Sequence, residues 1–332
     1  MINDEKVVIA DERHHFVPKA YLKRFTKNLS GFLFRAKTKP YKKENIMKRH
    51  IERVCFIDNF YTLRNFGQHF ELQATDPNYI EKNAFKYEST LERIFSLVGS
   101  KELPIDQPAL LQFIEILLSI KHRNPAFKEK FLNEYADKEK MRRTLLKHSE
   151  ELKVRLLQQP GVGSTDLDKV IQRSIDSIVN DNSLPDLSYK KAILENSKPG
   201  NTPLSDVRDA LSKMLILVHE PDDSDSFFIT SDNPGFTVVG NGIYNTEYGK
   251  LDAMGFPINS KQLVLFVNTP VQSSNPGISI AYQKVTNDQV DTSNFCTIFN
   301  SRESIFCEDR QYLEGVIDRF AKSEAAGVLT SK

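Results

Sequence analysis

The sequence has few cysteines, no tryptophan and no long apolar run. Its three cysteines are too widely spaced for a disulfide framework or a zinc pattern; they are Cys55, Cys296 and Cys307. No stretch reaches the ~18 consecutive apolar residues of a membrane helix, and the densest run, 110–120, contains Gln112 and Glu115. Residues 1–12 carry four acids and no apolar core, so we expect no secretory signal there.

Common catalytic motifs are also absent. The sequence contains no G-x-G-x-x-G, P-loop, G-x-S-x-G or H-E-x-x-H pattern, which argues against the standard nucleotide-binding folds, lipases and zincins. The hydrophobic fraction of 39% in 332 residues is ample for a core. We therefore expect a cytoplasmic α+β protein with no membrane partner.

The near-neutral net charge of +1 hides an asymmetry. Residues 13–53 contain thirteen Lys or Arg and two acids, whereas residues 201–332 contain ten bases and seventeen acids. Aromatic residues interrupt the basic segment, among them Phe16, Tyr21, Phe25, Phe32 and Phe34. Because bases bind phosphates and aromatic rings stack on bases of nucleic acid, segment 13–53 predicts a nucleic-acid partner. Two alternatives remain open: the aromatics form core, or the basic and acidic halves attract each other.

The pattern of segments predicts helices in the middle and strands at both ends. Residues 13–320 are expected to form one interleaved α+β domain with a helical region at 76–219, between tails at 1–12 and 321–332. The C-terminal strands are expected to pair with the N-terminal ones. Residues 159–164 are the best linker candidate.

Periodicity and capping signals place the individual helices. One helix is expected from Asp76-Pro77 to Val98, and a nearly all-apolar central helix from Asp106 to His122. A long charged helix, either continuous or broken once, should cover 126–157, and another should begin at Thr202-Pro203 and bury Val218.

After residue 223 the pattern changes to strands. Strands are expected at 227–230, 236–239, 263–267, 278–282 and 304–307, with a helix at 288–299 and a last helix capped by Asp309.

His15 begins the basic segment and is a candidate general base. Imidazole exchanges protons near neutral pH, and a histidine pair beside Val17-Pro18 is similar to the opening of some metal-dependent nucleases. The alternative is a structural histidine that holds the N-terminal segment in place.

Asp232 and Asn233 lie in a Thr-Ser-Asp-Asn-Pro-Gly sequence at the end of an expected strand. A carboxylate and an amide at a strand end can bind a metal, a ribose or a phosphate. The alternative is a turn in which these side chains satisfy their own backbone.

Glu81, Glu88 and Glu92 fall near one side of the helix expected at 76–98. Glu81 and Glu88 could hold a metal together with Asp232, or they could form a solvated face. Arg123 leaves the end of the central helix, so it is expected either to pair with a buried carboxylate or phosphate or to serve as a simple C-terminal cation.

Three segments together resemble a bacterial family of uncharacterised proteins, classed as a domain of unknown function (4238), over about residues 13–310. The family's H-x-x-P-x-x-Y/F-L-x-x-F opening matches His15, Pro18, Tyr21 or Leu22, and Phe25. Its spaced glutamates match Glu81 and Glu88, its T-S-D-N-P strand end matches 230–234, and Phe256-Pro257 matches a further step loosely. The resemblance implies that His15, Glu81, Glu88, Asp232 and Asn233 lie near one another, and it implies no activity.

These observations lead to two functional hypotheses. In the first, the protein is a metal-dependent nuclease or phosphodiesterase with a role in phage defence: Glu81, Glu88 and Asp232 hold Mg²⁺ or Mn²⁺, His15 is the general base, and Arg123 and Asn233 complete the site. In the second, it is a non-catalytic nucleic-acid-binding or protein-interaction module.

Overall fold

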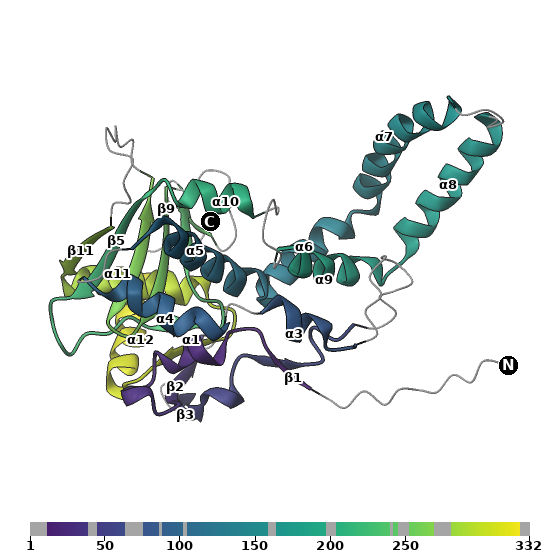
Figure 1. Cartoon of the computed structure of the whole chain (residues 1–332). Helices are drawn as coiled ribbons and strands as arrows, with labels where there is room; N and C mark the ends of the chain where they lie inside the picture. Colours follow the sequence, from purple (N-terminus) through teal and green to yellow (C-terminus); the bar gives the residue numbers. More distant parts are fainter. Residues whose placement is uncertain are drawn as a thin grey trace.

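The computed structural model describes residues 12–38, 45–63, 76–85, 88–101, 105–158, 164–196, 204–239, 242–244, 252–268 and 280–325. Along the chain, strands come before and after a helical middle. In space, the helices α7 (Lys138–Leu157) and α8 (Ser164–Asn180) project from the rest of the molecule (Figure 1). The α+β class predicted from the sequence is confirmed.

The central helix α5 spans Gln107–His122. It begins where predicted, because the side chain of Asp106 accepts a hydrogen bond from the backbone N–H of Ala109 at 2.8 Å. Most of its apolar side chains are buried, together with those of α4 (Glu88–Gly99), against strands of the larger sheet. α5 is therefore the helix that carries the residues at its C-terminal end into the interior.

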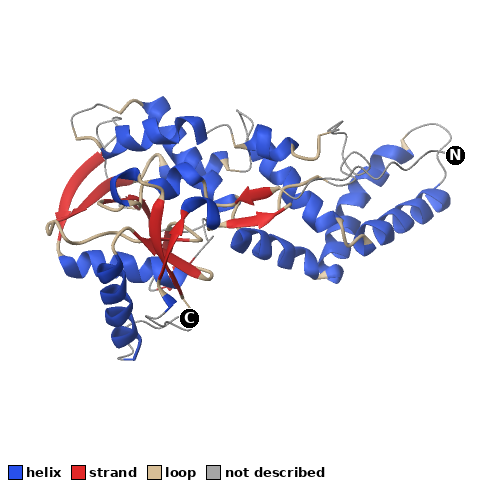
Figure 2. Cartoon of the chain, turned by 90° about the horizontal axis from the view of Figure 1, so that it is seen from below, coloured by secondary structure: helices blue, strands red, loops and turns tan. Residues whose placement is uncertain are grey.

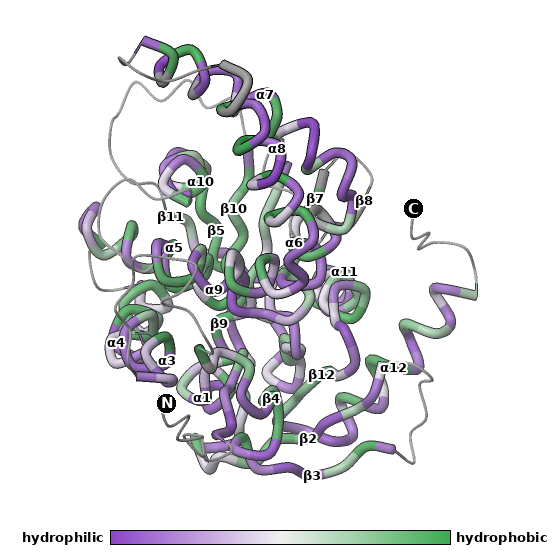
Figure 3. Tube along the Cα trace, turned by 90° about the vertical axis from the view of Figure 1, so that its right-hand side faces the viewer, coloured by the Kyte–Doolittle hydropathy of each residue, from purple (hydrophilic) through white to green (hydrophobic). Residues whose placement is uncertain are grey.

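The larger sheet has six strands in the order β11-β5-β10-β9-β7-β8. Their bounds are β5 Leu215–Pro221, β7 Phe236–Val239, β8 Gly242–Tyr244, β9 Ala253–Asn259, β10 Gln262–Val267 and β11 Ile280–Val285. All neighbours are antiparallel except β11 and β5, which are parallel. Figure 3 shows that the strands of this sheet are largely hydrophobic.

The expected helix at 202–218 is wrong in its second half. The helix α10 covers only Ser205–Leu211, and Val218 lies in β5, opposite Val264 of β10. The run Leu215-Ile216-Leu217-Val218 is apolar at every position, so its periodicity does not distinguish a buried strand from a buried helix. Pairing on both edges, with β10 and β11, makes it a strand.

A second sheet joins the two ends of the chain. It has the order β3-β2-β12-β6, with β2 Phe32–Lys37, β3 Met47–His50, β6 Thr230–Ser231 and β12 Ser304–Cys307. In the antiparallel pair of β2 and β12, Arg35 lies opposite Phe306. The helices α11 (Asn287–Asn300) and α12 (Arg310–Ala325) pack on this sheet through residues such as Ile298 and Leu313.

Short elements complete the N-terminal part. They are β1 Arg13–His15, α1 Lys19–Lys23, η1 Lys27–Leu29, η3 Ile51–Arg53 and β4 Phe56–Asp58. β1 and β4 form a two-stranded antiparallel sheet of their own, with His15 opposite Phe56.

Two of the expected helices are broken. The helix expected at 76–98 is instead α3 (Tyr79–Ala84) and α4, because the backbone leaves the helical region at Phe85, where ψ is 31°. The helix expected at 126–157 is α6 (Pro125–Ala136) and α7 (Lys138–Leu157), separated by Asp137 at ψ 85°. α8 (Ser164–Asn180) runs beside α7, and α9 (Leu184–Asn196) lies against α3 and α6 (Figure 1). Seen from below, helices extend from the end of the molecule away from the larger sheet (Figure 2).

Residues 159–163 of the predicted linker lie outside the described residues. Among the residues that are described, no helix combines the length and the apolar character needed to cross a membrane.

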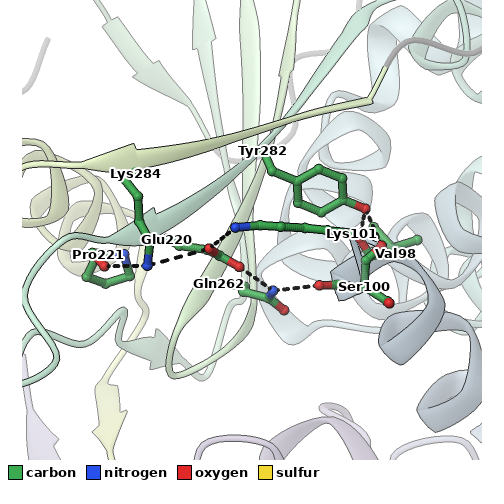
Figure 4. Close-up of polar contacts among 9 residues, drawn as sticks. Val98, Ser100, Lys101, Glu220, Pro221, Gln262, Tyr282 and Lys284 are labelled. Carbon is green, nitrogen blue, oxygen red and sulfur yellow. Dashed lines mark hydrogen bonds and ion pairs between the residues drawn. The ribbon is translucent and has the colours of Figure 1, made fainter. Parts of the chain in front are cut away.

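The end of α4 is held to the larger sheet by side chains (Figure 4). The hydroxyl of Tyr282 in β11 lies 3.0 Å from the carbonyl oxygen of Val98 and 2.7 Å from that of Ser100. Gln262 of β10 donates a hydrogen bond of 2.8 Å to the carbonyl oxygen of Gly99. The last carbonyls of a helix have no partner within it, so these side chains supply what the helix lacks.

We expect Tyr282→Phe to lower the free energy of unfolding by roughly 0.5–1.5 kcal/mol, the net value of one such hydrogen bond. The ring stays in place, so packing is preserved and only the contact with the end of α4 is lost. Urea unfolding followed by circular dichroism measures the change. An unchanged midpoint would show that the hydroxyl does not stabilise this junction.

Candidate functional site

The turn between α5 and α6 is the centre of the candidate site. Asn124 takes an extended conformation because proline follows it, and its side chain caps α6 by accepting a hydrogen bond from the backbone N–H of Ala126 at 2.9 Å. Two buried tyrosine hydroxyls bond to the end of α5: Tyr61 donates to the carbonyl oxygen of Arg123 at 2.6 Å, and Tyr189 to that of His122 at 3.0 Å. The turn is therefore fixed on several sides.

Arg123 forms a buried ion pair and is not a simple helix cap. Its side chain is 1% exposed, and Nη1 donates to the carboxylate of Glu88 at 2.6 Å. Nη2 donates to the backbone carbonyl oxygen of His15, and the guanidinium lies 3.9 Å from the ring centre of Phe85. Both terminal nitrogens are thus engaged, so Arg123 connects β1, α3 and α4 to the end of α5.

Glu81 lies within electrostatic range of Arg123 and Glu88, although α3 and α4 are separate helices. Burial raises the pKa of Glu81 to about 7; the positive charge of Arg123 lowers it and the negative charge of Glu88 raises it further. Its buried Oε2 has no hydrogen-bond partner among the described residues. Glu81 is therefore a carboxyl group suited to exchanging a proton near neutral pH.

The raised pKa of Glu81 predicts a pH dependence of stability. Between pH 4.5 and 7 the unfolded chain has released this proton while the folded chain keeps it, so ionisation weakens the folded state as the pH rises. We expect Glu81→Gln to gain stability relative to the wild type across this range. The comparison with the wild type matters because His14 and His15, whose pKa values burial lowers, act in the opposite direction. A difference in unfolding free energy that is constant from pH 4.5 to 7.5 would contradict the prediction.

The two histidines of β1 have different environments. His14 is buried, accepts a hydrogen bond from the backbone N–H of Tyr61 at 2.8 Å and stacks on its ring, so His14 is the residue that pins the segment. His15 is half-buried, and its buried Nε2 has no hydrogen-bond partner among the described residues. Burial, followed by the charges of Lys19 and Arg123, lowers the pKa of His15, which favours the neutral imidazole that a general base needs.

Asp232 satisfies the backbone of another segment and not its own. One carboxylate oxygen accepts the N–H of Arg302 at 2.9 Å, and the other accepts those of Glu303 at 2.8 Å and Ser304 at 3.0 Å. Burial outweighs these three donors and raises the pKa of Asp232 to about 6. The turn predicted as the alternative for Asp232 is therefore replaced by a contact between distant segments.

Asn233 belongs to a buried network. Its amide nitrogen donates to the carbonyl oxygen of Asn300 at 2.6 Å, and its side-chain oxygen lies 3.4 Å from Nζ of Lys121. Nζ of Lys121 donates to the carbonyl oxygen of Gly235 at 2.6 Å, and burial holds the pKa of Lys121 well below its usual value. The Asn233 side chain thus joins α11 to the end of α5.

The predicted residues gather on two sides of the same turn. Arg123 contacts Glu88 and the backbone of His15, whereas Asn124 donates a 2.5 Å hydrogen bond to the backbone carbonyl oxygen of Asp232. Glu81 lies on the Arg123 side and Asn233 on the Asp232 side.

The carboxylates predicted as metal ligands do not form one ligand set. No group of three or more His, Cys, Asp or Glu side chains in the described part of the chain is arranged to hold a metal ion, so Glu81, Glu88 and Asp232 are not such a group. Both oxygens of Asp232 already accept backbone N–H groups. Bound Mg²⁺ or Mn²⁺ therefore stays a prediction without structural support.

A cavity of about 340 Å³, which no sequence pattern predicted, lies beside Asp232. Arg35, Arg53 and Arg302 line it, together with Phe16 and Phe56. The three arginines come from positions 35, 53 and 302, and only the pairing of β2 with β12 brings these segments together. The high charge of segment 13–53 was the sole signal, and it did not identify the residues.

Comparison with known proteins supports the resemblance found in the sequence. The family model described as "Protein of unknown function (DUF4238)" matches residues 13–311. No curated protein matches the chain, and no solved structure does. The match covers most of the 332 residues and includes His15, Glu81, Glu88, Arg123 and Asp232. The chain therefore belongs to the DUF4238 family.

Proposed function

We propose that the protein binds single-stranded nucleic acid through the basic surface of residues 13–53. The observation that carries this proposal is the lack of internal neutralisation. Among the described residues, Arg24 is the only lysine or arginine of this segment that forms an ion pair with a described carboxylate, that of Glu92 at 2.8 Å. The remaining described bases keep their charge available for phosphates.

An exposed aromatic ring lies within this basic surface. Phe32 of β2 is 45% exposed, and Nζ of Lys48 lies 5.0 Å from its ring centre. The His50 ring packs edge-on against it, also at 5.0 Å. We call Phe32 with residues 47–50 the β3 patch. A ring beside phosphate-binding side chains is the arrangement on which unpaired bases stack.

The other aromatics of the segment are accounted for by packing. Phe16, Tyr21 and Phe25 are buried in the main core. The alternative interpretation, in which aromatics form core, is thus confirmed for these three residues but not for Phe32. The nucleic-acid proposal therefore rests on the bases and on Phe32 alone.

Among the described residues, no ion pair supports the alternative that the basic and acidic halves of the chain attract each other. β2 lies beside β12, yet none of the described ion pairs joins a base of 13–53 to an acid of 201–332. Arg302, next to β12, pairs with Glu129 of α6. The positive charge of the N-terminal segment is thus not consumed within the described part of the chain.

Binding of a fluorescent single-stranded oligonucleotide tests the proposal. We compare the wild type with Lys48→Glu/Arg49→Glu and with a control of equal charge change, Lys213→Glu/Lys322→Glu, whose lysines are exposed and lie outside the segment. Affinity should fall at least about tenfold in the patch variant and much less in the control. Equal affinities for the two variants, or no binding by the wild type at low salt, would contradict the proposal.

A second candidate function is phosphodiester cleavage. The observation in its favour is that two groups suited to proton transfer, Glu81 and His15, lie within electrostatic range of the buried Arg123 and that each has a buried atom without a partner among the described residues. Arg123 is engaged on both terminal nitrogens, so it would position these groups and not contact a phosphate.

Incubation of labelled RNA and DNA with the protein tests this candidate. Cleavage that is lost in both Glu81→Gln and His15→Gln, with folding retained, would support it. Parallel reactions with and without a chelator show whether cleavage depends on a divalent metal. No cleavage by the wild type, or cleavage that both variants retain, would rule out catalysis at this site.

A further inference from the structure

The arginine-lined cavity is built by three parts of the chain that meet only in the fold. Arg35 lies in β2, Arg53 ends η3, and Arg302 lies between α11 and β12. Its volume of about 340 Å³ is at the lower end of the ~300–1,000 Å³ of small-molecule sites. A cavity of this size fits one small ligand and not a length of polymer.

Three arginines and two carboxylates, those of Asp232 and Glu303, line the cavity, which leaves one net positive charge. Asp232 faces it but is held by three backbone N–H groups, and Arg302 pairs with Glu129. Arg35 uses Nε to donate to Ser304 Oγ at 2.8 Å, and its terminal nitrogens have no hydrogen bond or ion pair with described residues. Arg53 is exposed and forms no ion pair with a described carboxylate. Guanidinium groups whose terminal nitrogens have no partner among the described residues suit a phosphate, which accepts two parallel N–H bonds.

Apart from the charged residues and Ser304, the lining is apolar. Phe16 and Phe56 form one wall, and Phe306 of β12 contributes to the cavity as well. Cys55 lies between them in a left-handed backbone conformation, with φ at 54°, which is unfavourable for a residue other than glycine. Its carbonyl accepts the N–H of Phe16 at 2.9 Å, so the unfavourable conformation is part of what joins β1 to the wall. Apolar side chains in the same cavity as guanidinium groups suit a ligand with a ring at one end and a phosphate at the other.

We propose that this cavity binds a single nucleoside monophosphate unit, with the phosphate on Arg35 and Arg53 and the ring against Phe16 and Phe56. The unit is either a free nucleotide or the phosphorylated end of a strand. Binding of a free nucleotide is independent of the proposed function, whereas binding of a strand end rests on it. Arg302, already paired, completes the positive rim.

Calorimetric titration with free nucleoside 5′-monophosphates and with inorganic phosphate tests the proposal. The wild type should bind at least one nucleotide at least about tenfold more tightly than inorganic phosphate, because only the nucleotide meets the apolar wall. Arg53→Gln should weaken nucleotide binding by about tenfold or more, as expected for the loss of one charge-assisted contact. Arg53 is exposed, so this variant keeps the fold; Arg35→Gln provides a second, independent change.

The variant Lys213→Glu/Lys322→Glu, whose lysines are exposed and lie outside segment 13–53, serves as the control and should bind nucleotides as the wild type does. A preference of a 5′-phosphorylated oligonucleotide over its 5′-hydroxyl form, lost in Arg53→Gln, identifies a strand end as the source. Oligonucleotide binding without nucleotide binding and without a 5′-phosphate preference overturns this inference and leaves the proposed function standing. Nucleotide binding without oligonucleotide binding overturns the proposed function and leaves this inference standing.

Discussion

Arg123→Ala is expected to lower the free energy of unfolding by about 3 kcal/mol, the lower end of the cost of removing one partner of a buried ion pair, because the side chain of Glu88 is 35% exposed. The guanidinium is fully buried, and its removal breaks the contact with Glu88, the hydrogen bond to the His15 carbonyl and the contact with the Phe85 ring. Arg123→Lys should lose less, since it keeps the charge but not the planar fork. Chemical denaturation of each variant gives these values.

Arg310→Ala is the control for this experiment. Arg310 also forms an ion pair with a glutamate, Glu314, but its side chain is 54% exposed. Exposed pairs contribute little, so the change should stay below about 1 kcal/mol. If Arg123→Ala were as mild as Arg310→Ala, the junction of β1, α4 and α5 would not depend on this arginine.

Asp232→Ala is expected to lower the free energy of unfolding by about 3 kcal/mol, because the N–H groups of residues 302–304 lose their acceptor in a buried setting. Asp232→Asn should also destabilise, since its NH₂ group would face at least one of these donors. Exposed Asp225, on the loop before β6, gives the control, and Asp225→Ala should change stability by no more than about 0.5 kcal/mol. Stability equal to the wild type in Asp232→Ala would mean that the carboxylate does not hold this segment.

Local signals in the sequence predicted the parts of the fold that are determined locally. Asp106 and the Asn124-Pro125 pair mark the ends of α5 because capping and the conformation before proline depend on neighbouring residues. The strand that contains Cys307, β12, was predicted. Its pairing with a strand from the N-terminal part was also expected, and that strand is β2. The break at Phe85 was missed because the apolar stripe continues through it.

Contacts between residues far apart in the sequence were harder to predict. The sequence indicated that Arg123 has a buried partner, but the choice of Glu88 depends on how α4 packs beside the end of α5. The strand β9 was missed because Gly255 and Pro257 are unfavourable in strands, and it forms because β7 and β10 pair with it on both sides. Arg53 and Arg302 gave no signal of proximity at all, since nothing local records which segments meet.

The most direct test of the nucleic-acid proposal is the salt dependence of oligonucleotide binding. Each phosphate contact to a single strand contributes a slope of about −0.7 in log Kobs against log salt concentration. We expect a steep negative slope for the wild type and a slope shallower by about 1.4 for Lys48→Glu/Arg49→Glu, because two contacts are removed. A flat slope for the wild type, or identical slopes for the two proteins, would contradict the account.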